Sequence, residues 1–496
     1  MTEEEGAAPR GLRRDWLTRV RAVLLAPKDA ASLAAFRILF GILGFVSALR
    51  FQVYGWVDQL FVEPQFTFHY FGAAWVRQLG PTATHALFGA LTVLSACVAL
   101  GLFYRPAIFL VFLGFTYVQL LDVTNYLNHY VLFSLLAALM TLMPLNGKWS
   151  IDALLFPRLR RETFPTWCTY LLRFQVGTVY TCAGLAKVTE DWLVHAQPLQ
   201  IWLAARTDTP LIGPLLTLPG AGHVMSWAGC LFDLSVAWFL LFGRTRPFAY
   251  VAVLVFHALT KMLFPIGMFP AIMVVAATVF FAPSWPRRYL RHIPWLRGAQ
   301  DAPIDGAEAP ASTRRPAAPP THAPTMKLKL ALGLGAVYMA IQIFLPLRTH
   351  LYGGNVLWHE QGMRFSWRVM VREKNGSVTY RLTHPETGRV TEVHPRKYLD
   401  QRQQREFSTQ PDLILQLAQH IARDVGNREG VRPIVQVDAI ASLNGRRAAR
   451  LIDPEVDLAS ISDSLARAAW ILPAPTEPPP AIRPVAWKSA SSAAFP

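Results

Sequence analysis

Long blocks of apolar residues, separated by short polar loops, fill most of the chain up to residue 346. Several blocks reach the roughly 17–20 residues that a helix needs to cross the hydrocarbon core of a bilayer. The third and fourth blocks lie close together, as do the seventh and eighth, and these pairs predict helical hairpins. The nine segments that the pattern predicts as transmembrane helices are 31–49, 83–103, 107–121, 127–145, 167–187, 222–243, 247–264, 266–283 and 328–346.

After the ninth segment the pattern changes to the shorter runs of a soluble domain. Strand-like composition marks FSWRVMVREK, SVTYRLTH, RVTEVH and RPIVQVDAIAS, whereas DLILQLAQHIARDV repeats its apolar residues at a helical spacing. The predicted fold is therefore a polytopic α-helical membrane protein of about nine transmembrane helices, followed by a small α+β, mainly β, soluble domain.

The composition changes along the chain predict its division into parts. We expect an N-terminal segment at 1–30, a transmembrane domain at 31–346 and a soluble domain at 350–472. A Pro/Ala-rich stretch at 297–325 predicts a flexible loop within the transmembrane part, and the tail at 473–496 predicts disorder.

Composition and charge support a membrane protein and give it an orientation. Of the 496 residues 52% are hydrophobic and only 16% are charged, and the net charge is +16. The basic residues gather in alternate loops, as the positive-inside rule predicts for a cytoplasmic N-terminus. Nine spans then place the soluble domain outside the cytoplasm. No basic and aromatic motif indicates a nucleic-acid partner, and the four cysteines have no metal-binding spacing.

This topology brings polar residues from three separate segments into the outer half of the bundle. They are Asn128 and His129 at the start of the fourth span, Lys187 at the end of the fifth and His257 in the seventh. Polar groups in apolar spans usually face a cavity or one another. Each residue alone also permits a simpler reading: Lys187 extending to water at the membrane surface, or a histidine packing between helices.

Asp233 lies inside the sixth span, and we expect it to be a structural partner for an arginine such as Arg37 or Arg173. Lysine differs from arginine in that desolvation can leave it as a neutral amine, which is able to act as a general base. Gly184, one turn before Lys187, leaves room either for a flat ligand or for close helix packing. Neighbouring asparagine and histidine donors could stabilise an oxyanion. The pattern therefore predicts an intramembrane site for an apolar ligand that releases a proton, such as a quinol.

Six stretches in a fixed order carry a family resemblance. They are FRILFG at 36–41, LNHY at 127–130, YTCAGLAKVTEDW at 180–192, FDLS at 232–235, FHALTKMLFPIGMF at 256–269 and RFSWRVM at 364–370. With these stretches the chain resembles the vitamin K-dependent γ-glutamyl carboxylase family and its bacterial relatives. The resemblance to the bacterial relatives implies an integral protein of a bacterial inner membrane.

The resemblance implies an activity, its co-substrates and its residues. The family's catalytic lysine would be Lys187, which deprotonates reduced vitamin K (phylloquinol or menaquinol), and its Asn-His pair would be Asn128 and His129. Quinol epoxidation by O2 would then supply the strong base for carboxylation of a peptide glutamate with CO2, without metal, biotin or ATP. The residues implied for quinol binding are His257, Phe264, Met268 and Phe269, and those implied for glutamate binding are Trp367 and Arg372.

The chain also departs from the animal enzymes. Its soluble region is far shorter and has no cysteine, so the disulfide between the membrane and soluble parts of the animal enzymes cannot form. The identity of the protein substrate therefore stays open. The alternatives are a quinol epoxidase that does not carboxylate and a non-enzymatic membrane folding or lipid-binding factor. A transporter ranks last, because no internal repeat is apparent.

Overall fold

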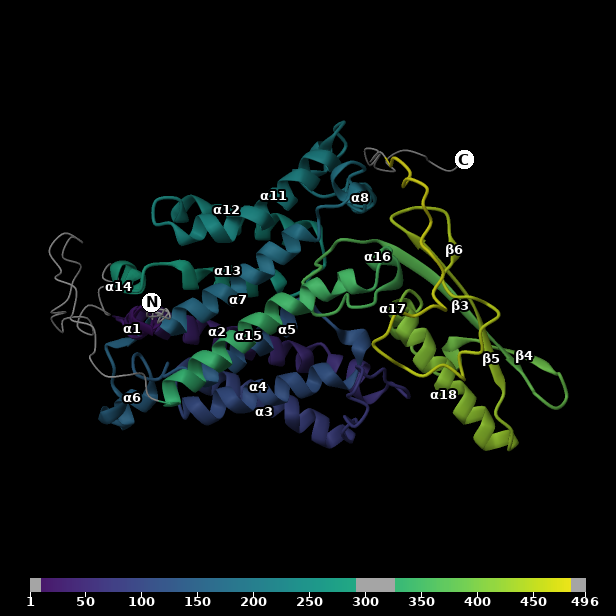
Figure 1. Ribbon diagram of the computed structural model, residues 1–496, viewed down its shortest axis with the longest axis horizontal. Helices are drawn as coiled ribbons and strands as arrows, with labels where there is room; N and C mark the ends of the chain where they lie inside the picture. Colours follow the sequence, from purple (N-terminus) through teal and green to yellow (C-terminus); the bar gives the residue numbers. More distant parts are fainter. Residues whose placement is uncertain (1–9, 291–325, 483–496) are drawn as a thin grey trace, which may run out of the picture.

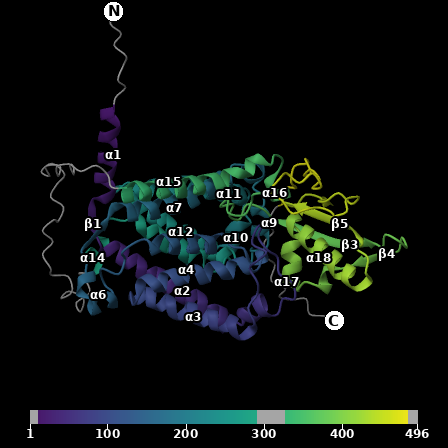
Figure 2. The same ribbon diagram turned by 60° about the horizontal axis from the view of Figure 1, so that its bottom comes forward.

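The computed structural model describes residues 10–290 and 326–482. The predicted loop at 297–325 lies outside the described residues, as does most of the predicted tail. A helical bundle forms the larger part of the molecule, and the soluble domain lies at one end of it (Figure 1). The same end-to-end arrangement is visible after rotation (Figure 2).

Each of the nine predicted apolar segments contains a helix in the described part of the chain. Within residues 10–290 and 326–482, six helices are long and apolar enough to cross a membrane, whereas α5 and α13 are shorter apolar helices. The chain is thus a polytopic helical membrane protein. The bundle helices are α2 (Ala31–Val53), α3 (Pro81–Leu100), α4 (Tyr104–Leu121), α5 (Asn128–Thr141), α7 (Thr166–Leu185), α11 (Ala221–Leu241), α12 (Arg246–Leu263), α13 (Phe269–Ala277) and α15 (Met326–Leu347).

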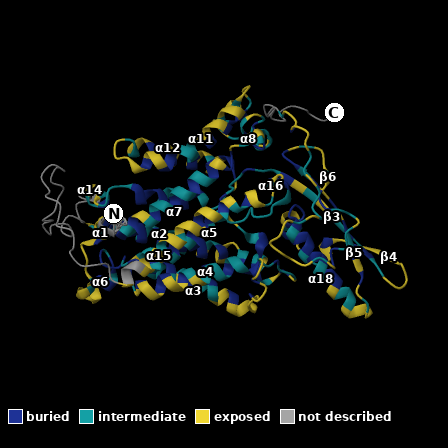
Figure 3. Cartoon of the chain, in the orientation of Figure 1, coloured by how far each residue is buried: buried dark blue, intermediate teal, exposed yellow. Residues whose placement is uncertain are grey.

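Apolar side chains cover much of the outer surface of these helices. Trp238, Phe248 and Val251 are more than half exposed, at 56%, 78% and 57%. Figure 3 shows exposed residues along the outward faces of the bundle and buried ones between the helices. Apolar faces turned outward on long helices are expected where lipid, rather than water, surrounds the protein.

The end of the bundle far from the soluble domain is built from short elements. It holds α1 (Arg10–Leu25), α6 (Ile151–Leu155) and α14 (Trp285–Leu290) (Figure 1). Strand β1 (Pro27–Asp29) pairs antiparallel with β2 (Thr163–Pro165).

The soluble domain is an antiparallel sheet with a helix on one face. The strand order is β4-β3-β5-β6. Its inward face packs on α18, where the Tyr380 hydroxyl donates to the Ile414 carbonyl at 2.8 Å. The elements are β3 (Lys374–Thr383), β4 (Val390–Val393), α17 (Gln401–Phe407), α18 (Pro411–Glu429), β5 (Ile434–Leu443) and β6 (Ala449–Arg450).

Three of the four predicted strands and the predicted helix of this domain are confirmed. The strand predicted for FSWRVMVREK is wrong, because only its last residue, Lys374, belongs to a strand. Within this stretch Phe365, Trp367 and Met370 adopt φ values of 63°, 59° and 51°. Left-handed residues break a strand, and they turn successive side chains toward different neighbours.

Shorter helices lie at the end of the bundle that faces the soluble domain (Figures 1 and 2). They are α8 (Glu190–Leu193), α9 (Leu199–Ala204), α10 (Gly213–Leu216) and α16 (Val356–His359). Asp191, in α8, binds Arg446 of the soluble domain in a salt bridge at 2.6 Å, and it also accepts from Asn444 at 2.7 Å. This partly buried charge pair helps to fix the orientation of the sheet on the bundle.

Candidate functional site

Lys187 follows the last turn of α7 and is buried, with 6% of its surface exposed. Its Nζ donates to Asp233 Oδ2 at 2.8 Å, to the Ala183 carbonyl at 3.3 Å and to the Val369 carbonyl at 3.4 Å. The Trp192 ring lies 5.4 Å from the same nitrogen. The amine is therefore enclosed by protein and does not extend to the membrane surface.

The expected pairing of Asp233 with an arginine is wrong. Arg37 donates to the Trp149 carbonyl at 2.5 Å. Arg173 donates to three carbonyls in the turn that follows α13, beginning with Val279 at 2.8 Å. The Asp233 carboxylate instead faces Lys187, because α7 and α11 pack side by side with these two residues at the same level.

Gly184 allows this close packing. A Cβ at Gly184 would lie 2.7 Å from both the backbone nitrogen and Cγ of Leu234, closer than real contacts allow. Of the two uses that the sequence left open for this glycine, the structure favours helix packing. Leu234, the residue after Asp233, fills the space beside Gly184. The glycine therefore sets the short distance between α7 and α11 that brings Lys187 and Asp233 together.

Asn128 and His129 begin α5. The Asn128 amide donates to the Arg368 carbonyl at 3.3 Å, and its oxygen accepts from the Tyr126 hydroxyl at 2.8 Å. His129 is buried, and its Nε2 has no hydrogen-bond partner among the described residues. A buried ring nitrogen without a partner is costly to leave unsatisfied, so it marks a position where a polar ligand atom would be stabilised.

His257 projects from α12 and reaches the same region from the opposite side. Its Nε2 lies 3.2 Å from the Tyr180 hydroxyl, whereas its Nδ1 has no partner in the described chain. The Phe269 ring lies 5.5 Å from the His257 ring and 5.8 Å from the His129 ring. Phe269 therefore bridges the two histidines through ring contacts.

The two other implied quinol-binding residues lie apart from this contact. Met268 is partly buried against the hydrophobic core of the helical bundle. Phe264 packs edge-on against Trp202, with ring centroids 5.7 Å apart, in a small separate cluster. Met370 packs on that cluster as well. Phe264 thus supports the wall of the site from behind.

A cavity of about 600 Å³ opens beside Asn128, His129 and Phe269. Its volume is within the usual range for small-molecule sites. Val369 and Met370 form part of the wall, and aromatic residues form much of the remainder, namely Phe51, Trp56, Phe61, Phe88, Phe115, Tyr126 and Tyr130. Lys187 and His257 are not part of the lining. The Lys187 amine lies behind it, because it donates to the carbonyl of Val369.

Residues 364–374, here called the connecting segment, link the Asn128 and Lys187 parts of the site. The segment provides the carbonyls of Arg368 and Val369 to Asn128 and Lys187. Trp367 is 1% exposed and packs in the hydrophobic core of the helical bundle. Its indole nitrogen has no hydrogen-bond partner in the described chain. The left-handed turns of this segment therefore carry its carbonyls and its tryptophan into the bundle.

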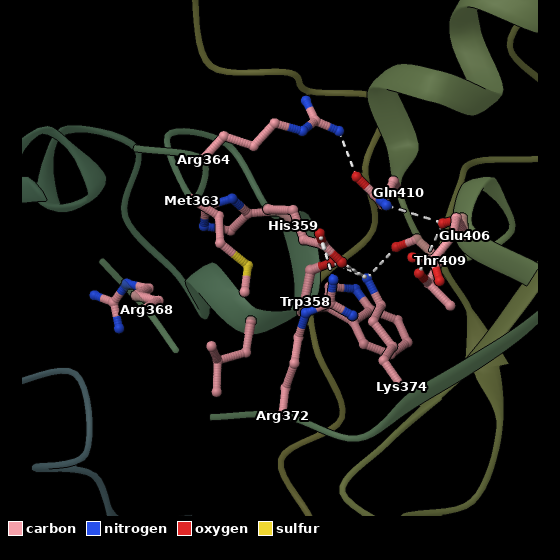
Figure 4. Close-up of polar contacts among 12 residues, drawn as sticks. Trp358, His359, Met363, Arg364, Arg368, Arg372, Lys374, Glu406, Thr409 and Gln410 are labelled. Atoms are coloured by element: carbon pink, nitrogen blue, oxygen red, sulfur yellow. Dashed lines mark hydrogen bonds and ion pairs between the residues drawn. The ribbon is translucent and has the colours of Figure 1, made fainter. Parts of the chain in front are cut away.

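The end of the connecting segment holds a second buried charge cluster. Glu360 accepts from Arg372 at 2.9 Å and from Lys374 at 3.1 Å. The Lys374 amine also donates to the carbonyls of Trp358 and Thr409, each at 2.5 Å, and Figure 4 shows it pointing toward Thr409. Burial lowers the pKa of Lys374 from 10.5 to about 8, although the Glu360 carboxylate opposes this effect.

Sequence patterns gave no indication of this cluster or of the Asp233 pairing. Lys374 starts an alternating strand and could as easily face solvent, and Glu360 adopts a φ of 58° in a loop. The Arg372 guanidinium is engaged in an ion pair with Glu360, and Arg372 does not line the cavity.

Comparison with protein families agrees with this architecture. Residues 25–285 match the HTTM domain, and residues 327–477 match the lumenal domain of the vitamin K-dependent gamma-carboxylase. No solved structure matches the chain. The first match covers the bundle from α2 to α13, and the second covers nearly all of α15 and the soluble domain.

The chain belongs to the vitamin K-dependent carboxylase family. Membership implies a carboxylase kind of function in an integral membrane protein, with reduced vitamin K, O2 and CO2 as the small molecules and a glutamate-containing protein as the substrate.

Proposed function

We propose that the chain is a vitamin K hydroquinone-dependent γ-glutamyl carboxylase in which Lys187 takes a proton from the quinol. The observation that carries this proposal is the enclosed Lys187 amine directly behind the wall of a cavity whose lining is largely aromatic. The aromatic lining suits a flat quinol ring, and the unpartnered His129 Nε2 suits a ring hydroxyl. Asn128 and Phe269 would complete the contact surface.

Asp233 gives the proton of the Lys187 ammonium a place to go, because the carboxylate that accepts the hydrogen bond can take that proton and leave a neutral amine to accept the quinol proton. The two side chains form a pair with no net charge, whichever of them holds the shared proton. When the pair accepts the quinol proton its charge becomes +1, while the quinol becomes an anion, so the site as a whole stays neutral. Charge balance of this kind matters because isolated charges are expensive in a low-dielectric interior.

The remaining residues would hold this arrangement in place. His257 and Tyr180 would fix Phe269 and the inner wall, with Met268 and Phe264 behind them. Trp367 would anchor the connecting segment so that the Val369 carbonyl stays on the Lys187 amine. Arg372 would keep the segment attached to the soluble domain through Glu360. Oxidation of the bound quinol by O2 to its epoxide supplies the base that removes a glutamate γ-proton, and CO2 adds at that carbon.

The proposal includes an orientation and a division of the chain. We place residues 1–30 in the cytoplasm and the soluble domain at 350–472 outside it, in a bacterial inner membrane. The basic loops support this choice, since they alternate along the chain. Labelling of single introduced cysteines, one beside Arg160 and one beside Arg389, with a membrane-impermeant maleimide would test it. Labelling of intact cells at the first position would contradict the orientation.

Purified protein with phylloquinol, bicarbonate and a glutamate-containing peptide tests the activity. We expect both quinone epoxide and carboxylated peptide from the wild type, and neither from Lys187→Ala. Lys187→Arg is the matched control, because arginine keeps the charge but does not lose its proton. Wild-type activity in either variant contradicts the assigned base. Epoxide without carboxylated peptide from the wild type would instead identify a quinol epoxidase, and no quinol turnover would leave the non-enzymatic alternative.

A further inference from the structure

Two arginines line the cavity from opposite parts of the chain. Arg50 lies in the last turn of α2, and Arg402 lies in α17 of the soluble domain. Cations are unusual in a cavity whose wall is largely aromatic. Their presence requires an explanation beyond the binding of an uncharged quinol.

Arg50 has no carboxylate partner. Its guanidinium lies 5.1 Å from the Trp56 ring and 5.9 Å from the Tyr54 ring, and it forms no salt bridge with any residue that the structure describes. It lies close enough to His129 and Tyr130 to interact with both electrostatically. Aromatic contacts hold the plane of the guanidinium while leaving its N–H groups available to a ligand.

The guanidinium of Arg402 uses only part of its hydrogen-bonding capacity. Its terminal nitrogens donate to the Thr124 carbonyl and hydroxyl, each at 3.2 Å, and its distance to Asp122 is 3.8 Å. Asp122 already accepts from Gln403 at 2.9 Å. The Nε of Arg402 is buried and has no partner among the described residues. The charge of Arg402 is therefore not neutralised by close hydrogen bonding to a carboxylate.

We propose that Arg50 and Arg402 form a carboxylate-binding pair that holds the substrate glutamate in this cavity. This inference rests on the proposed function and places the glutamate beside the quinol site. It differs from the assignment of glutamate binding to Arg372, whose guanidinium is occupied by Glu360. A guanidinium recognises a carboxylate through two parallel N–H donors, which makes arginine well suited to the task.

The chemistry of the carboxylation explains why two cations are present. The γ C–H bond breaks, and its proton goes to the base that quinol oxidation supplies. The electron pair left on carbon forms a C–C bond to CO2. The side chain thus changes from one carboxylate to two on the same carbon, and its charge from −1 to −2. Two guanidinium groups match the product and also stabilise the negative charge that develops before it forms.

Glu406 lines the same cavity, and its charge is opposite in sign to that of the two arginines, which makes it useful for a test. It lies in α17 one turn after Arg402. A carboxylate here repels a second carboxylate, so neutralising it should favour the ligand. A structural role for these three residues would not produce opposite effects on binding that follow the sign of the charge removed.

The test measures peptide binding by the full-length protein without turnover, in the absence of O2 and bicarbonate. The probes are three fluorescein-labelled peptides that differ at one position, which is glutamine, glutamate or γ-carboxyglutamate. We expect affinity to rise in that order for the wild type. Arg50→Gln and Arg402→Gln should each weaken binding of the glutamate peptide by about tenfold or more, the range for a charge-assisted hydrogen bond. Glu406→Gln should strengthen it.

Arg105→Gln and Arg389→Gln are the matched controls, because both arginines are exposed and lie outside the cavity. Thermal unfolding of every variant checks its folding. An arginine variant that unfolds is replaced by lysine at the same position, Arg50→Lys or Arg402→Lys, which keeps the charge but removes the two parallel N–H donors and should still weaken binding. The proposal is overturned when Arg50→Gln and Arg402→Gln still prefer glutamate over glutamine as strongly as the wild type, or when the control variants lose that preference equally. A wild type that makes no epoxide would refute the proposed function without affecting this comparison.

Discussion

Lys187 and Asp233 form a single buried unit, with 2.8 Å between Nζ and Oδ2 and less than a tenth of either side chain exposed. Lys187 directly follows α7 and Asp233 lies in α11, and the whole α8–α10 region separates these two helices in the chain. Removing one member of such a pair leaves an uncompensated charge, whereas replacing both with apolar groups is often tolerated.

This relationship predicts a non-additive result. Lys187→Met and Asp233→Leu should each lower the free energy of unfolding by about 3–5 kcal/mol, and the double variant should regain most of that loss. None of the three should form quinone epoxide, because the proton acceptor is absent or uncoupled. Thermal unfolding in detergent, with epoxide formation measured on the same preparations, separates stability from activity. Additive losses of stability would contradict the pairing, and epoxide from the double variant would contradict the assigned base.

Substitution of His129 should weaken quinol binding without destabilising the fold. Because its Nε2 has no protein partner, His129→Phe removes an unsatisfied polar atom and should change stability little. The variant should raise the KM for the quinol about tenfold, since a hydrogen bond to the ring hydroxyl is lost. Initial rates at varied quinol and fixed peptide measure this. His85→Phe, at an exposed position, is the control. An unchanged quinol KM in His129→Phe would exclude His129 from the quinol site.

Gly184 should be intolerant of even one methyl group. A Cβ there would meet the Leu234 backbone nitrogen at 2.7 Å, so Gly184→Ala should push α7 away from α11 and separate Lys187 from Asp233. We expect a loss of about 1–3 kcal/mol in stability and a larger proportional loss of epoxide formation. Gly177→Ala is the matched control on the same helix, because a Cβ there would lie 4.0 Å from Ala237. Equal effects of the two substitutions would contradict the role of Gly184 in spacing the helices.

The sequence predicted those parts of the fold that depend on local patterns. Apolar blocks marked the bundle helices, and alternation marked β3 and β5, because each pattern lies within one element. The connecting segment escaped prediction because the left-handed turns at Trp367 and Met370 depend on docking into the bundle. Its composition alone resembles a strand.

The sequence predicted which polar residues lie at the same depth in the bundle more readily than it predicted which residues they pair with. Asn128, His129 and His257 were expected at one depth, and the first two lie at the cavity, while His257 reaches it through Phe269. The partner of Asp233 depends on the register between α7 and α11, which no pattern within either helix specifies. The burial of Lys374 likewise depends on the loop that places Glu360 beside it.

Lys374 should give the soluble domain a pH-dependent stability. Burial lowers its pKa to about 8 in the folded protein, whereas the unfolded chain keeps the ordinary value of 10.5. Between these values the unfolded chain binds more protons, so the contribution of Lys374 to the free energy of unfolding rises with pH. The penalty for burying the charged form, which is fully present below about pH 8, disappears as the amine loses its proton.

Lys374→Met removes this titration, and Glu360 keeps its partner Arg372 in that variant. The stability of the wild type relative to the variant should therefore increase between pH 8 and pH 10.5, by about 3 kcal/mol in full. Denaturant unfolding of both proteins at matched pH values measures the difference. Lys397→Met, at an exposed position, should show no such trend relative to the wild type. A difference between wild type and Lys374→Met that stays constant across this window would mean that Lys374 titrates as an ordinary surface lysine, and the buried cluster with Glu360 would not form in solution.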